Sequence, residues 1–338
     1  MLFVLFGQSA TILMARLYYS KGGKSKWMVT LAQLTGFPVL IPYYSILPSE
    51  NPTTDSLHRR LPLTSLLASI YILFGIFLAA NTMMYSVGIL YLPIHTFLFL
   101  CAFQMTFTAF FSSYLHLQSF SSSKIVSPFL LSTPSILLVF GSDSAKPGGV
   151  PNGNYAAAFT CTIVASAGYG LLLSLMQLSI RKVLKRETCK VILEMIICQS
   201  LIATIVVIMG LFVSGEWRGL KREMEEFKLG KLSYVMTLAQ AAIASQIFNI
   251  GALGLTFEVS SFFSNVISGF GLPIVSVLAV IFFEDEMDGI KVVSMVLAMW
   301  GFVSYVYLQH LDSSKFKEKE NGGDDPKLPL SKEEFEKE

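Results

Sequence analysis

The sequence predicts an all-α polytopic membrane protein. Of its 338 residues, 53% are hydrophobic and only 14% are charged, whereas about 25% of a typical soluble protein is charged. No Asp, Glu, Lys or Arg occurs from Leu61 to Ser123 or from Val259 to Phe283. A helix needs about 20 apolar residues to cross the bilayer core. The first stretch therefore holds two crossings and the second holds one.

Ten membrane-spanning helices are expected in chain order, and polar or turn-rich segments separate most of them. The first five are Met1–Leu17, Trp27–Ser49, about Leu63–Tyr85, about Leu92–Leu115 and Ile125–Ser142. The second five are Asn154–Ile180, Val191–Ser214, Leu232–Phe257, Val259–Phe283 and Val292–His310.

The spans divide into two halves, residues 1–145 and 146–312. Five spans in each half give the halves opposite orientations in the membrane, as an inverted repeat requires. The remaining segment, 313–338, is charged and poor in large apolar residues, so it is expected to be a disordered cytoplasmic tail.

A short amphipathic helix is expected between the seventh and eighth spans. Trp217, Leu220, Met224 and Phe227 share one helical face there, with charged residues opposite. Such a helix is typical of a segment that lies on the membrane surface.

Basic residues in the short loops indicate the orientation. The dense cluster between Arg181 and Lys190 and the basic residues after the last span favour the cytoplasmic side. Both termini are then cytoplasmic, and the plasma membrane is the expected location.

Two spans carry polar stripes at helical spacing. The ninth span has Ser261, Ser264, Asn265 and Ser268, and the fourth has Cys101, Gln104, Thr108 and Ser112. Lipid does not satisfy such groups, so these faces look into the protein. A seam of small residues for helix packing is one interpretation. Asn265, and Pro273 as an interruption of the ninth helix, favour a cavity wall instead.

Several classes of function fit the sequence poorly. A sugar-phosphate transporter needs Lys or Arg inside the spans to bind phosphate, and a membrane enzyme needs clustered His, Asp or Glu. The span interiors have essentially no Lys or Arg, no such cluster of His, Asp or Glu occurs, and there is no ATP-binding phosphate loop. The four cysteines lack metal-ligand spacing. No cofactor, metal or nucleic-acid partner is therefore expected, the oligomeric state is open, and a non-transporting scaffold or receptor remains an alternative.

Several segments resemble the plant purine permeases of the drug/metabolite transporter superfamily. The similarity runs from Tyr18 to about Asp312 and includes YLPIHTF, RKVLKRET, GLFVSGEWRGLKREMEEFKLGKLSYVMTLAQ and FEVSSFFSNVIS followed by LPIVSVLAVIFFEDEMDGIKVV. The resemblance implies ten helices in two inverted halves and proton-coupled import of purine bases, cytokinins or related rings. Other heterocyclic metabolites, such as alkaloids or vitamin-like rings, are the alternative substrates.

The sequence departs from the family pattern at three positions. His95 stands where a small Ser is typical, Asn81 lies near a usual Asp, and Ser245 stands where a Trp is usual. Because changes at Asn81 and Ser245 alter a binding cavity, the resemblance leaves the substrate more open than the fold.

A purine-like substrate is flat and edged with donors and acceptors, so its site needs aromatic faces and a few amides. Gln104 and Asn265, from opposite halves, are the first candidates for substrate contacts. Thr96, Ser261, Ser264 and Asn81 are further candidates. For each amide, a hydrogen bond between helices is the alternative role.

Proton coupling needs a titratable group within the pathway. Glu194 and Glu258 are the acidic residues near membrane depth, where desolvation favours the protonated form. For Glu194, an ion pair with Lys190 is the alternative, and for Glu258 it is capping of the ninth helix. His95 is the third candidate, since imidazole titrates near neutral pH.

Overall fold

The computed structural model describes residues 1–46, 60–115, 151–184 and 189–283, together with the single positions 293, 296, 300 and 303. All regular secondary structure in these ranges is helical. The fifth expected span, most of the tenth and the 313–338 tail lie outside the described residues.

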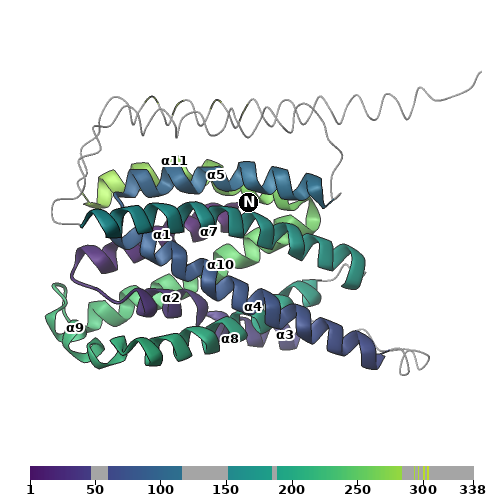
Figure 1. Ribbon diagram of the computed structural model, residues 1–338, viewed down its shortest axis with the longest axis horizontal. Helices are drawn as coiled ribbons and strands as arrows, with labels where there is room; N and C mark the ends of the chain where they lie inside the picture. The colour runs from purple at the N-terminus through teal and green to yellow at the C-terminus, as the bar shows by residue number, and fades with distance from the viewer. Residues whose placement is uncertain are drawn as a thin grey trace, which may run out of the picture.

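Seven long helices lie side by side with their axes roughly along the long dimension of the bundle (Figure 1). Each contains a stretch long and apolar enough to cross a membrane, which supports a multi-pass membrane protein. They are α1 Leu2–Ser20, α4 Arg60–Tyr91, α5 Ile94–Tyr114, α7 Asn152–Ser179, α8 Cys189–Ser214, α10 Lys231–Glu258 and α11 Ser261–Phe283. A π-helical turn, η3 Ile180–Leu184, extends α7.

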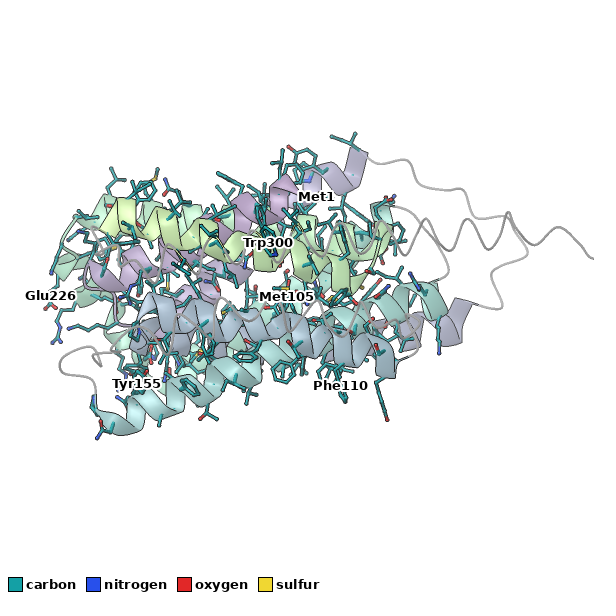
Figure 2. All side chains as sticks on the ribbon, turned by 90° about the horizontal axis from the view of Figure 1, so that it is seen from above. Met1, Met105, Phe110, Tyr155, Glu226 and Trp300 are labelled. Atoms are coloured by element: carbon teal, nitrogen blue, oxygen red, sulfur yellow. The ribbon has the colours of Figure 1, made fainter. Side chains whose placement is uncertain are left out.

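The outer surface of the bundle is apolar, as lipid contact requires. Phe110 is 63% exposed and Ile281 is 65% exposed. Figure 2 shows Phe110 projecting away from the bundle, whereas Met105 is buried between helices.

The second span is the clearest correction to the sequence prediction. Residues 27–46 do not form one helix but three short ones, α2 Lys26–Leu34, η1 Phe37–Leu40 and α3 Ile41–Ile46. Pro38 and Pro42 have no N–H to donate, and each destabilises a helix that continues through it. The start of α2 is well defined because the Ser25 hydroxyl accepts a hydrogen bond from the Met28 N–H at 3.1 Å.

Prolines affect the other spans unequally. The third span continues past Gly88 to Tyr91, six residues beyond its expected end at Tyr85, and stops shortly before Pro93. The residue before a proline disfavours helical backbone angles, which explains the boundary. Pro273, in contrast, lies inside α11, which continues to Phe283.

The helices α1 and α10 meet through glycines. A Cβ on Gly251 of α10 would lie 2.8 Å from the Val4 backbone nitrogen of α1, and one on Gly7 would collide with the Phe248 backbone. Small residues let membrane helices approach closely where packing must replace the hydrophobic effect. This contact fixes α1, from the first half of the chain, against α10, from the second.

The segment expected to be amphipathic is helical but packs partly on the bundle. It forms η4 Glu216–Arg218 and α9 Leu220–Glu226, and Figure 2 shows Glu226 at one end of the bundle. Phe227 is 3% exposed, with its ring centre 5.3 Å from that of Tyr234. One part of the segment's apolar face therefore packs on the bundle. Another part does not, since Trp217 remains 45% exposed.

Replacing Gly251 by Ala should destabilise the protein by about 1–3 kcal/mol, because the added methyl group overpacks the contact between α1 and α10. Gly254→Ala on the same helix is the matched control, since its Cβ meets nothing within 4 Å and Ala favours helix over Gly. Thermal unfolding of purified protein in detergent measures both. Equal melting temperatures for the two variants would contradict the close contact.

Candidate substrate-binding site

A cavity lies between the helices, and residues of α1, α2, α4, α5, α7 and α10 line it. The space open to the centre of a water molecule is about 130 Å³. A single bound water needs about 10–15 Å³ in the same measure. The cavity is therefore large enough for a compact ring compound.

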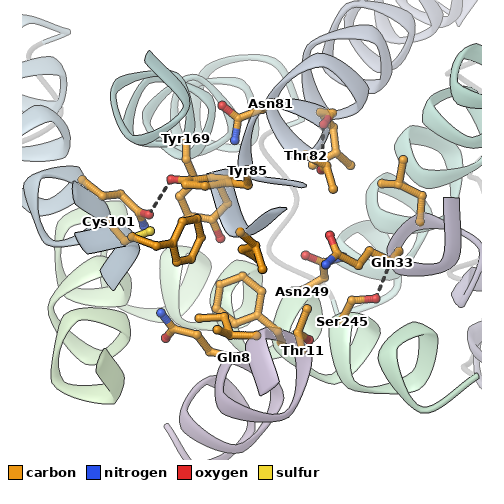
Figure 3. A pocket seen from close by; sticks show the side chains of 17 residues that line it. Gln8, Thr11, Gln33, Asn81, Thr82, Tyr85, Cys101, Tyr169, Ser245 and Asn249 are labelled. Atoms are coloured by element: carbon orange, nitrogen blue, oxygen red, sulfur yellow. Dashed lines mark hydrogen bonds between the residues drawn. The ribbon is translucent and has the colours of Figure 1, made fainter. Parts of the chain in front are cut away.

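Five amide side chains converge on this cavity from five helices (Figure 3). They are Gln8 on α1, Gln33 on α2, Asn81 on α4, Gln104 on α5 and Asn249 on α10.

Most of these amides have donors and acceptors to spare. The Gln8 Oε1 atom is buried and accepts no hydrogen bond from the described residues. Buried polar atoms are nearly always hydrogen-bonded in folded proteins. This oxygen lies against α11, because a Cβ built on Gly271 would be 3.0 Å from it.

Gln104 is held firmly by its neighbours. Its Oε1 accepts a hydrogen bond from the Tyr85 hydroxyl at 3.1 Å, and its Nε2 donates to Asn265 Oδ1. Asn265 Nδ2 in turn donates to the hydroxyl of Thr108. This chain of hydrogen bonds fixes which way the Gln104 amide faces.

Four aromatic rings also line the cavity: Tyr85, Phe97, Tyr169 and Phe248. The rings of Tyr169 and Phe248 lie nearly parallel, with centres 6.2 Å apart, and those of Tyr85 and Phe97 meet edge to face at 6.0 Å. These pairs already satisfy each other's preferred geometry, so a flat ligand would lie against a remaining face or edge.

No charged side chain lines the cavity among the described residues. Burying an ion away from water without a partner is very costly, so this wall suits a neutral ligand with donors and acceptors at its edge. Nor do the described residues contain three or more His, Cys, Asp or Glu grouped to hold a metal ion.

The break in the second span positions Gln33 on this wall. Gln33 is near the end of α2, where its carbonyl is no longer used within a continuing helix. That carbonyl accepts the Ser245 hydroxyl and, at 3.4 Å, the Gln246 Nε2 of α10. Side chains of α10 thus supply the hydrogen bonds that the Gln33 carbonyl needs where the helix breaks, because hydrocarbon surroundings offer none.

Comparison with known proteins identifies the family. A family model described as purine nucleobase transmembrane transport matches residues 1–315. The chain belongs to the purine permease family. Purine permease 21 of Arabidopsis thaliana is 50% identical over 93% of this chain and 80% of its own length. Probable purine permease 10 and probable purine permease 8 of the same organism are 47% and 49% identical, with the same coverage.

The fold also matches a solved structure. A crystal structure covers 90% of this chain and 98% of its own, with a TM-score of 0.57 at 13% identity. Membership of the purine permease family supports the interpretation that this multi-pass membrane protein transports purine nucleobases. Permeases are not enzymes, and the family match indicates no catalytic activity.

Asn81 and Gln104 are the two predicted substrate contacts that the structure places on the cavity wall. Asn265 is fully buried behind Gln104 and bonds to it. The Ser261 hydroxyl donates to Gln177 Oε1 at 2.7 Å, and that of Ser264 donates to the Ala252 carbonyl at 2.8 Å.

These serines, with Asn265, therefore form the buried face of α11 that packs on other helices, and none of them lines the cavity. Thr96 is buried on α5 and likewise absent from the cavity wall. Their direct contact with substrate stays a prediction.

Two of the candidate proton sites, Glu194 and Glu258, lie apart from the cavity wall. Glu194 is half-buried on α8. The described ion pairs do not include one between Glu194 and Lys190, whose Nζ lies 5.0 Å from the centre of the Tyr44 ring. The His95 side chain lies outside what the structure describes.

Glu258 does not cap the ninth helix, which was the alternative role considered for it. It is the last residue of α10 and is exposed, and α11 begins only at Ser261. Ser260 takes the expected capping role, because its hydroxyl accepts the Phe263 N–H at 3.1 Å.

Sequence reasoning missed Gln8 and did not select Asn249 as a contact. Gln8, Thr11 and Ile12 all line the cavity, and their spacing of three and four residues places them on one face of α1. That pattern is visible in the sequence, but it does not distinguish a cavity wall from a packing seam.

Proposed function

We propose that this purine permease is a proton-coupled secondary transporter that imports purine nucleobases and related rings, including cytokinins, by alternating access. The observation that carries the proposal is the uncharged cavity with amides from five helices. A purine edge alternates donors and acceptors, and amide side chains pair with such edges. We place the protein in the plasma membrane, with both termini cytoplasmic.

Helix pairing supports two inverted halves within a ten-span protein. α1 packs on α10 as α7 packs on α4, and α5 packs on α7 as α11 packs on α1. The pairs α2 with α8 and α5 with α11 complete the pattern. Exchanging α1 with α7, α2 with α8, α4 with α10 and α5 with α11 therefore reproduces the same arrangement, as a repeat related by a two-fold axis requires.

Two connections lie at a common end of the bundle, as the expected order of spans requires. The Lys228 N–H donates to the Lys21 carbonyl at 3.0 Å, and the Ser25 hydroxyl donates to Glu216 Oε2 at 2.6 Å. The loop after α1 and the α9 segment thus lie on the same side of the bundle. Both are expected outside the cell when the termini are cytoplasmic.

Substrate contact is tested by uptake of labelled adenine into cells that lack their own nucleobase permeases. Asn249→Ala should raise KM about fivefold, because one hydrogen bond contributes about 1 kcal/mol. Gln240→Ala is the control, since Gln240 is an exposed amide on the same helix, away from the cavity. An unchanged KM for Asn249→Ala would remove this residue from the site, and no uptake by the wild type at the cell surface would contradict the proposed function.

Proton coupling is tested with Glu194→Gln, Glu258→Gln and His95→Ala. We expect one of them, with half-buried Glu194 first, to abolish accumulation against a gradient while adenine exchange persists, because only the driving step needs the titrating group. Glu225→Gln is the control, since Glu225 is a partly exposed carboxylate paired with Lys231. If all three variants still accumulate adenine and lose it with a protonophore, coupling does not use these groups.

A further inference from the structure

Two glycines in the middle of α7 have different surroundings. A Cβ on Gly170 would lie 2.9 Å from the backbone nitrogen of Thr108, so this glycine lets the backbone of α5 approach closely. A Cβ on Gly168 would lie 2.6 Å from Asn81 Oδ1, and the atoms that come next belong to side chains and lie 3.5 Å away or more. Gly168 therefore makes room for a side chain of the cavity wall and not for a neighbouring backbone.

The Asn81 amide occupies this room without a hydrogen bond. Asn81 is 5% exposed, and no hydrogen bond joins its amide to another of the described residues, as Figure 3 shows for the cavity wall. Leu78, Thr82 and Tyr85, on the same face of α4, also line the cavity. Because no hydrogen bond holds the Asn81 amide, the atoms that it packs against determine its position.

A methyl group at Gly168 would displace this amide toward the cavity. Non-bonded heavy atoms attract best at about 3.5–4.0 Å, so a carbon 2.6 Å from Asn81 Oδ1 would force the amide away from α7. Protein interiors are close-packed, and the open space beside Asn81 is the cavity that it lines. The displaced amide would therefore enter the cavity and narrow it.

We propose that Gly168 determines the substrate specificity of the cavity by letting the Asn81 amide lie back against α7. The width of the cavity at Asn81 depends on the absence of a Cβ at Gly168, and so does the size of the substituent that a bound purine can carry. Gly168 is a positioning residue, since it acts through Asn81. This inference rests on the proposed transport function and adds a residue that limits the size of its substrate.

The position is suited to a mutational test, because a change there should spare the fold. Alanine stabilises a helix interior relative to glycine. The atom that a Cβ at Gly168 would meet is the far end of a flexible side chain. Gly168→Ala should therefore fold, and its effect should fall on the cavity and not on the packing of the bundle.

The test measures uptake of labelled adenine and its inhibition by benzyladenine, an adenine whose amino group carries a benzyl ring. In Gly168→Ala, the ratio of the benzyladenine inhibition constant to the adenine KM should rise about tenfold, since one methyl group in a close-fitting pocket has an effect of that size. Asn81→Ala alone should not raise the ratio. Adding Gly168→Ala to Asn81→Ala should then change the ratio less than about twofold, because the amide through which Gly168 acts is gone.

Gly153→Ala is the matched control on α7, since a Cβ there meets nothing within 4 Å. Its ratio should equal that of the wild type. An unchanged ratio in Gly168→Ala overturns the proposal. So does an equal rise with and without the Asn81 amide, because the methyl group would then act on something else.

Melting temperatures of the purified proteins separate this inference from the proposed function. Gly168→Ala should raise the melting temperature about 1–3 °C more in the Asn81→Ala protein than in the wild type, because only the Asn81 amide has to be displaced. Equal rises refute the positioning of Asn81 by Gly168. If the wild type takes up no adenine, the proposed function fails, and a larger rise in the Asn81→Ala protein still supports the positioning. If the wild type takes up adenine and the ratio is unchanged in Gly168→Ala, the proposed function stands and this inference fails.

Discussion

The need to satisfy polar groups without water organises this structure. Inside a bilayer, backbone and side-chain donors must find partners within the protein. On α11, the Ser261 hydroxyl donates to Gln177 and the Ser264 hydroxyl donates to the Ala252 carbonyl. The Asn265 amide accepts a hydrogen bond from Gln104 and donates one to Thr108. Other buried polar atoms of the described residues have no partner within the protein, among them the Gln8 Oε1 and the Ser268 hydroxyl.

The break in the second span follows from the same requirement. Pro38 and Pro42 destabilise a continuous helix, and the carbonyl of Gln33 is satisfied by Ser245 and Gln246 of α10. Because the break brings Gln33 to the cavity, a local consequence of proline chemistry helps to shape the site. It also ties the first half of the chain to the second.

A second polar cluster ties the halves together near α9. Glu223 accepts hydrogen bonds from the hydroxyls of Tyr18 and, at 3.3 Å, Tyr234. Tyr18 and Tyr234 come from α1 and α10, which also share the glycine contact at Gly7 and Gly251. These two helices are therefore joined both by close backbone packing and by this polar cluster.

The sequence by itself determined the helical class, most span positions and the family, because charge-free apolar runs and prolines act locally. It also selected Asn81 and Gln104, both of which line the cavity, since amides are rare in membrane spans. Only the tertiary structure decided that Gln104 faces the cavity while Asn265 lies behind it, and that Gln8 and Asn249 share the same wall. Helical spacing shows which residues share a face, but which helix or cavity that face meets depends on contacts between distant segments.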